Sequence, residues 1–228
     1  MGLHHLRKHL AIIPQEPFIL QGTLRFNVDP FNQHSDDEVI KALQDVKFFE
    51  TLRDEDVIEQ KLEGQKNENE GKTKQTSRRE KNTEIEKLKT QGIKIEDKFA
   101  YQLDSGGANL SQGQRQLICI ARAMVKNPKI LMMDEATSSI DQKTDFLIQS
   151  MIKNRLQDTT VLTVAHRLMT ICQYDKVFVL DGGEKRQEGS VLQLLGEPEE
   201  EGGSIDKSKY DGTGLFANLV NEGGKEFR

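Results

Sequence analysis

The chain has 228 residues, enough for one domain with a small insertion, and a formal net charge of −5 at pH 7. This acidic balance argues against a general nucleic-acid-binding protein, because phosphate backbones are bound by basic surfaces. No stretch approaches the about 20 apolar residues that cross a bilayer, so we expect any membrane connection to come through a partner or further sequence. Cys119 and Cys172 lie in helical, largely apolar patterns, which favour reduced thiols over a disulfide framework or a zinc site.

The first part of the chain, residues 1–62, starts with a predicted strand at residues 9–13. Pro14 ends this strand, because proline cannot donate a hydrogen bond to a sheet ladder. Gln15 follows at the junction of strand and loop, a position where most glutamines are simply solvated. The loop continues into GTLRFNVDPF at residues 22–31.

A helix is expected after Ser35, because Ser35 and Glu38 have the spacing of a capping box. Its apolar face contains Val39, Leu43 and Val46. The second part, residues 63–98, is dominated by charged and polar side chains, which bury too little surface to offset the entropy of ordering. We therefore expect a mobile insertion. The basic run at residues 76–79 leaves open a phosphorylation or docking site as an alternative to a solvated linker.

The third part, residues 99–195, opens with a Gly-rich turn that leads into a helix. Ser111 and Gln114 form a second capping box at the start of this helix, and Asn127 with Pro128 ends it. Its apolar face contains Leu117, Ala121 and Met124.

A short buried strand is expected at residues 130–133, and two adjacent acids, Asp134 and Glu135, follow it. Ligands of open α/β sheets bind at the carboxyl ends of strands, so paired acids there indicate a metal and a polarised water. Taken alone, a strand that ends in Asp-Glu decides little, because it is common in α/β proteins.

After Asp141 the sequence predicts a helix, then a β-branched strand at residues 159–164 that leads to His166. The helix has apolar positions at Leu147, Ile148, Met151, Ile152 and Leu156. A lone histidine is usually a surface or core residue with no chemical role.

A hairpin is predicted from residue 176 through the turn Gly182-Gly183, followed by a short helix at residues 191–195. The last part, residues 196–228, is an acidic, Gly-rich tail. It is expected to be irregular except for a terminal helical turn at residues 215–220.

In this order and spacing, the motifs resemble the ATP-binding cassette (ABC) ATPases of membrane transporters. LSQGQ at residues 110–114 resembles the signature, ILMMDE at 130–135 the Walker B motif with its catalytic glutamate, and SSID at 138–141 the D-loop. His166 resembles the switch histidine. IIPQEPFILQGTLRFNVDPF at residues 12–31 is similar to the Q-loop region of the C subfamily, the multidrug-resistance-associated group, and its LRFNVDPF tail points to the second nucleotide-binding domain.

The resemblance implies an α/β fold: a P-loop NTPase-like ABC ATPase domain with a RecA-like core and a small helical subdomain. The Walker A loop, G-x-x-x-x-G-K-[ST], occurs nowhere in the sequence, and in the family it precedes the Q-loop together with an aromatic residue that stacks on adenine. We therefore expect a fragment of a longer transporter, with Met1 an internal methionine, that by itself binds ATP poorly and is inactive.

The resemblance also implies ATP and Mg²⁺ as cofactors and assigns roles to the site residues. Asp134 would hold Mg²⁺ through its waters, and Glu135 would polarise the attacking water. His166 would contact the γ-phosphate. Gln15 would reach the metal and the water and couple both to the transport domain.

The signature residues act on another nucleotide in the family. Ser111, Gly113 and Gln114, with Asp141 of the D-loop, would meet ATP held by the opposite domain of a head-to-tail pair, because a helix N-terminus favours an anion. Gln112 stands where many members have Gly, which leaves open whether this signature serves a hydrolytic or a slower site.

The leading functional prediction is therefore a nucleotide-binding domain of an exporter. It would hydrolyse ATP with a second such domain, face the cytoplasm beneath transmembrane domains, and drive transport of organic anions, conjugates or drugs without any nucleic-acid partner. The alternatives are a non-catalytic regulatory module of a channel-type relative, or a fragment that only supplies Ser111 and its neighbours to a partner's ATP. Chromosome-maintenance ATPases share the signature but insert long heptad coiled coils, and residues 63–98 show no sustained heptad.

Overall fold

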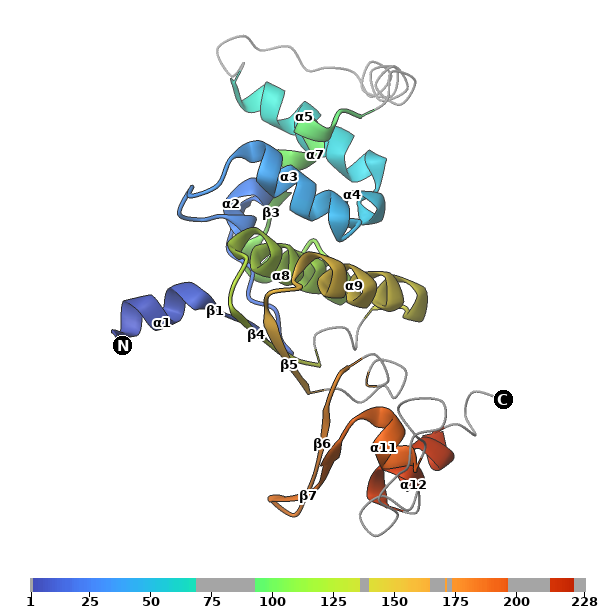
Figure 1. Ribbon diagram of the computed structural model, residues 1–228. Helices are drawn as coiled ribbons and strands as arrows, with labels where there is room; N and C mark the ends of the chain where they lie inside the picture. The colour runs from blue at the N-terminus through green and yellow to red at the C-terminus, as the bar shows by residue number, and fades with distance from the viewer. Residues whose placement is uncertain are drawn as a thin grey trace. The chain divides into compact units, whose positions relative to one another are not determined.

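The computed structural model describes residues 2–68, 93–135, 140–164, 171, 174–196 and 214–223 (Figure 1). The chain divides into two compact units, Met1–Val164 and Ala165–Arg228. The first unit contains all the candidate site residues that the structure describes.

A three-stranded parallel sheet in the order β1-β4-β5 lies at the base of the first unit. Its strands are β1 (Leu10–Ile13), β4 (Ile130–Asp134) and β5 (Thr160–Val164). Ile13 is in register with Met133, and Asp134 with Val164. The carboxyl ends of the three strands therefore meet at one edge, where Gln15 and Glu135 follow in sequence.

The remaining elements of the first unit are mostly helical. They are α1 (Leu3–His9), α2 (Leu24–Val28), α3 (Asp36–Asp45), α4 (Phe48–Thr51), α5 (Asp54–Glu68), α7 (Ile95–Phe99), α8 (Gln112–Lys126), α9 (Gln142–Arg155), the antiparallel pair β2 (Gly22–Thr23) and β3 (Gln102–Leu103), and a 3₁₀ turn at Ser105–Gly107.

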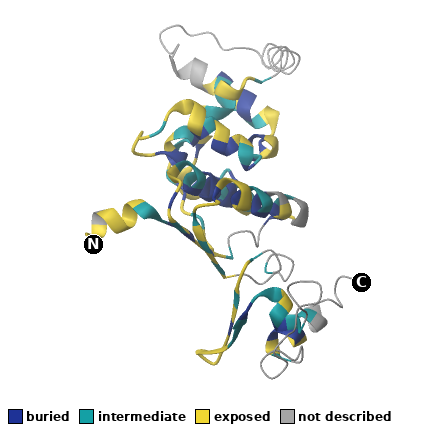
Figure 2. Cartoon of the chain, in the orientation of Figure 1, coloured by how far each residue is buried: buried dark blue, intermediate teal, exposed yellow. Residues whose placement is uncertain are grey.

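Helix α8 forms the centre of the core, and Figure 2 shows buried residues concentrated along it. Its start has the predicted capping box, and it ends at Asn127, which adopts a left-handed conformation with φ 45°. Leu117, Ile120 and Ala121 are buried on the side of α8 that packs into the core. The predicted limits of this helix are confirmed, and they place Ser111 at its exposed N-terminus.

The expectation of a buried strand at residues 130–133 is correct for only one face. Leu131 and Met133 are buried, whereas Met132 is exposed. Ile12 and Leu162, which are in register with Met132, are also exposed. Side chains alternate between the two faces of a strand, and a continuous apolar run in the sequence does not reveal which face is covered.

The predicted insertion at residues 63–98 is wrong at its margins, because α5 continues to Glu68 and α7 begins at Ile95. Three acids in the first turn favour α5 through the helix dipole. The Lys61 ammonium lies 2.8 Å from the Asp97 carboxylate and joins the two helices. Residues 69–92 lie outside the described residues, so for them the insertion stays a prediction.

Helix α1 was not predicted, and the first strand begins at Leu10, one residue later than expected. Basic residues occupy the last turn of α1, where they favour the helix dipole. Lys126, the last residue of α8, donates to the carbonyl oxygens of Arg7 and Leu10, each at 2.8 Å. A contact across more than 110 residues thus stabilises this helix end, and local sequence patterns do not contain such a contact.

The second unit has the predicted hairpin and short helix. Strands β6 (Val177–Asp181) and β7 (Glu184–Gly189) pair antiparallel around two glycines with positive φ, 58° and 80°. This is the backbone that a two-residue hairpin turn requires. Helices α11 (Val191–Leu195) and α12 (Leu215–Gly223) follow, and Val179, Leu194 and Phe216 form a small core. Within the described residues of both units, no helix is long and apolar enough to cross a bilayer.

Candidate functional site

The first group of site residues lies at the carboxyl edge of the parallel sheet. Gln15 is two residues beyond β1, Asp134 is the last residue of β4, and Glu135 comes next. The side-chain amide of Gln15 donates to Oε2 of Glu135 at 3.1 Å, across 120 residues of sequence. The fold therefore brings together the polar residues that the sequence predicted as one site.

Glu135 has an unusual backbone for a residue with a side chain. Its φ of 47° lies in the left-handed region, which costs an L-residue about 1–2 kcal/mol. Its N–H nevertheless donates to the carbonyl oxygen of Val164 at 3.1 Å, so the residue stays anchored to β5. The turn directs the chain out of the strand at the position where a catalytic carboxylate was predicted.

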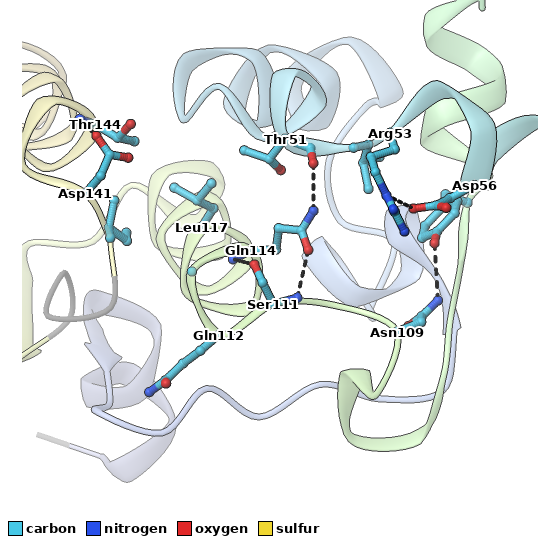
Figure 3. Close-up of a pocket in the computed structure, with 14 residues that line it drawn as sticks. Thr51, Arg53, Asp56, Asn109, Ser111, Gln112, Gln114, Leu117, Asp141 and Thr144 are labelled. Carbon is cyan, nitrogen blue, oxygen red and sulfur yellow. Dashed lines mark hydrogen bonds and ion pairs between the residues drawn. The ribbon is translucent and has the colours of Figure 1, made fainter.

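The second group lies at the N-terminus of α8, and Figure 3 shows its hydrogen bonds. The Ser111 hydroxyl accepts from the N–H of Gln114 at 3.2 Å, and the Gln114 side chain accepts from the N–H of Ser111 at 2.8 Å. The same Gln114 side chain donates to the Thr51 carbonyl at 2.8 Å, which ties the start of α8 to the end of α4.

The N-terminus of α8 has the chemistry of an anion site. The N–H groups of Gln112 and Gly113 precede the first intrahelical hydrogen bond, and the helix dipole is positive at this end. Accepting one bond leaves the Ser111 hydroxyl proton available, because a hydroxyl can donate once and accept twice. Ser111 is exposed and Gly113 is half-buried, so a ligand can approach both.

A cavity of about 800 Å³ opens at this helix start. Residues from the α4–α5 junction, the loop before α8, and the starts of α8 and α9 line it (Figure 3). The lining is mixed: Thr51, Arg53, Asn109, Ser111 and Asp141 are polar, whereas Leu52, Leu117 and Ile140 are apolar. Ligand cavities for small molecules typically measure about 300–1,000 Å³, and this cavity lies within that range.

Asp141 lies in this cavity as the N-cap of α9, where Oδ1 accepts from the N–H of Thr144 at 3.0 Å. The fold thus unites the predicted D-loop acid with the signature residues. The N-cap bond fixes the start of α9, and the predicted contact of Asp141 with a nucleotide stays a prediction.

The predicted switch histidine, His166, and the D-loop serines Ser138 and Ser139 lie outside the described residues. Their roles stay predictions.

Two residues of α8 that the sequence prediction missed hold the loop after β1. Gln116 donates to the Gln15 carbonyl at 2.8 Å, and Arg122 donates to the carbonyls of Phe18 at 2.6 Å and Asn27 at 2.5 Å. Burial lowers the pKa of Arg122, and the carbonyl oxygens compensate part of the lost hydration. The available signal was a polar residue, Gln116, inside the apolar face of an amphipathic helix.

Comparison with known proteins identifies the family. Residues 2–138 match the model of the ABC transporter family. The chain belongs to this family. It is 37% identical over 225 residues to the Drosophila melanogaster protein named "Probable multidrug resistance-associated protein lethal(2)03659" and 39% identical over 199 residues to the Mus musculus ATP-binding cassette sub-family C member 4. These alignments cover 99% and 87% of this ABC chain, but only 12% of each relative.

A solved structure supports the same fold. A bacterial Atm1-family ABC exporter with ATP bound superimposes with a TM-score of 0.67 and 25% sequence identity over 97% of this chain and 30% of the exporter chain. The predicted fold class, an ABC ATPase domain with a parallel sheet, is confirmed. The similarity to multidrug-resistance-associated proteins is confirmed as well.

The ABC transporter family implies ATP and Mg²⁺, and the residues at the sheet edge fit the metal. Asp134 and Glu135 offer carboxylate oxygens and Gln15 an amide oxygen, the ligands that Mg²⁺ prefers. Across the described ranges, no three His, Cys, Asp or Glu side chains gather into a metal-binding group. Mg²⁺ does not need one, because it keeps several waters and binds through one or two carboxylates and substrate phosphates.

Proposed function

We propose that this chain is the nucleotide-binding part of a C-subfamily ABC exporter and hydrolyses ATP together with a second nucleotide-binding domain. The Gln15–Glu135 hydrogen bond at the carboxyl edge of the sheet is the observation that carries this proposal. The cargo would be organic anions, conjugates or drugs, because relatives include proteins named for multidrug resistance and an ATP-dependent bile acid permease of Saccharomyces cerevisiae. The LRFNVDPF segment favours the second nucleotide-binding domain.

Hydrolysis requires a base-like group that orients water beside the γ-phosphate. Glu135 performs this role: it accepts a hydrogen bond from the attacking water while the Gln15 amide, 3.1 Å away, fixes its carboxylate. Mg²⁺, when bound, neutralises phosphate charge. Asp134 would hold the ion through its waters, Gln15 would also reach it, and His166 would contact the γ-phosphate.

The N-terminus of α8 binds the ATP of the partner domain. The Ser111 hydroxyl and the N–H of Gly113 donate to its γ-phosphate, as the helix-terminus chemistry favours. Binding of phosphate at this helix start is coupled to α4, because the Gln114 side chain donates a hydrogen bond to the Thr51 carbonyl at the end of α4. The transmembrane domains of the same transporter complete the assembly, with this domain facing the cytoplasm.

The chain acts as part of a longer transporter. It spans 12% of the fly and mouse relatives, and its own sequence contains no G-x-x-x-x-G-K-[ST] loop to cradle phosphates. Alone it would bind ATP weakly and show no turnover.

The test is Glu135→Gln in the transporter that contains this chain. We expect ATPase turnover to fall about 100-fold or more, because a positioned acid-base group contributes about 10²–10⁴-fold, while nucleotide binding persists. Glu59→Gln makes the same change at an exposed position of α5 and should keep full turnover. Undiminished turnover in Glu135→Gln would refute the role of Glu135.

A further inference from the structure

Gln116 is a completely buried glutamine in α8, with an exposed fraction of 0%. Its Nε2 donates to the carbonyl oxygen of Gln15 at 2.8 Å. The partner is a carbonyl, which only accepts, so the orientation of the Gln116 amide is fixed by chemistry. Since the Gln15 side chain in turn donates to Glu135, Gln116 acts on Glu135 through a single residue.

The Gln116 side chain gives the Gln15 carbonyl a hydrogen bond where the parallel sheet has ended. Strand β1 ends at Ile13, so the main chain of Gln15 lies beyond the ladder. Gln15 itself is exposed, and the next side-chain tether from α8 comes three residues later, from Arg122 to Phe18. The position of Gln15 therefore depends on Gln116.

Stability of the core does not explain this amide. Oε1 of Gln116 is buried and, within the part of the chain that the structure describes, has no hydrogen-bond partner. Burying an acceptor without a partner is unfavourable, and an apolar side chain of similar volume avoids that cost. Leu117 and Ile120 beside it show that the helix face is otherwise apolar.

We propose that Gln116 is a positioning residue, which holds the main chain of Gln15 so that the Gln15 amide can fix Glu135. This inference rests on the proposed function, because ATP hydrolysis is what the Gln15–Glu135 pair serves. Gln116 sets the rate of the chemical step and leaves nucleotide affinity unchanged.

The first measurement needs no activity. In the 228-residue chain, Gln116→Met should leave the thermal midpoint unchanged or raised, because removing the buried unpaired acceptor at similar volume offsets the loss of one hydrogen bond to the main chain of the exposed Gln15. NMR order parameters of the backbone amides of Gln15 and Glu16 should fall. Gln44→Met, on the exposed side of α3, is the matched control and should change neither. A lowered midpoint with unchanged order at Gln15 would mean that Gln116 is only structural.

The second measurement is the ATPase rate of the transporter. Gln116→Met should lower kcat about tenfold at an unchanged KM for Mg·ATP, the pattern of an interaction that acts on the chemical step. A raised KM with normal kcat would overturn the proposal.

The two measurements separate the inference from the proposed function. If Glu135→Gln abolishes turnover but Gln116→Met keeps the wild-type rate and order parameters, the inference fails alone. If Glu135→Gln keeps full turnover, the proposed function fails, and the role of Gln116 in catalysis fails with it. Order parameters would then report only whether Gln116 holds the loop.

Discussion

The buried carboxylate of Asp29, at the end of α2, makes the stability of the fold depend on pH. Burial raises the pKa of its carboxyl group, but hydrogen bonds from the backbone of His34 and Gln33 and from the Arg25 guanidinium outweigh burial and leave the pKa below its ordinary value. A lowered pKa means that the folded state holds its proton less tightly than the unfolded state. Asp29 therefore contributes stability above its unfolded pKa, and this contribution is lost as pH falls through the folded pKa.

Replacing Asp29 with Asn should remove this dependence. At neutral pH we expect a loss of about 1.5–3 kcal/mol in the free energy of unfolding, the usual contribution of a hydrogen bond to a charged group. Below the folded pKa the wild type and the variant should converge. Urea unfolding at a series of pH values checks this, with Asp37→Asn at the exposed start of α3 as control. Parallel curves for wild type and Asp29→Asn would contradict the linkage.

Helices α3 and α8 begin with the same local structure and offer a matched pair. Ser35 with Glu38, and Ser111 with Gln114, each form a complete capping box. The first box is purely structural in our interpretation, whereas the second also forms the proposed phosphate site.

Ser35→Ala and Ser111→Ala should each destabilise the domain by about 1 kcal/mol, the typical worth of an N-cap. Only Ser111→Ala should also reduce ATPase activity in the transporter, by about 100-fold, because one lost transition-state donor costs about 10²–10³-fold. Chemical denaturation and steady-state turnover on both variants test this. Equal turnover in the two variants would show that the α8 box is only a cap.

The local elements were predictable from sequence because their signals are local. Each of these signals lies within a few residues: the two capping boxes use side chains three positions apart, and the helix end at Asn127 and the two-glycine turn use the backbone conformations of those residues. The end of α1 is instead held by Lys126, and α5 is joined to α7 by the Lys61–Asp97 ion pair. Because these contacts join distant parts of the sequence, local patterns did not predict α1 or the full length of α5.

The candidate site divides in the same way. Gln15, Asp134, Glu135 and Ser111 were found from motifs, and the parallel register explains why the first three meet. Gln116 was missed, because a glutamine inside a helical stripe is ambiguous until its partner 101 residues away is known.

At the scale of the whole molecule, the contacts around residues 69–92 decide how far the domain depends on this segment. Gln60 exchanges two hydrogen bonds with the backbone of Gln102, at 2.8 and 3.0 Å. Lys98 donates to the Phe49 carbonyl at 3.1 Å and lies 2.9 Å from the Asp54 carboxylate. The chain on either side of residues 69–92 is thus connected directly to the rest of the first unit.

Replacing residues 69–92 with a short Gly/Ser linker should therefore change the thermal midpoint by no more than about 4 °C, the shift that about 1 kcal/mol produces in a domain of this size. Closing a shorter loop costs less entropy, which offsets any lost contacts. In the wild type, limited trypsin should cut first at Arg78 or Arg79, as a solvated linker predicts. Resistance there, together with a large fall in the midpoint of the shortened chain, would instead make this segment an ordered part of the domain.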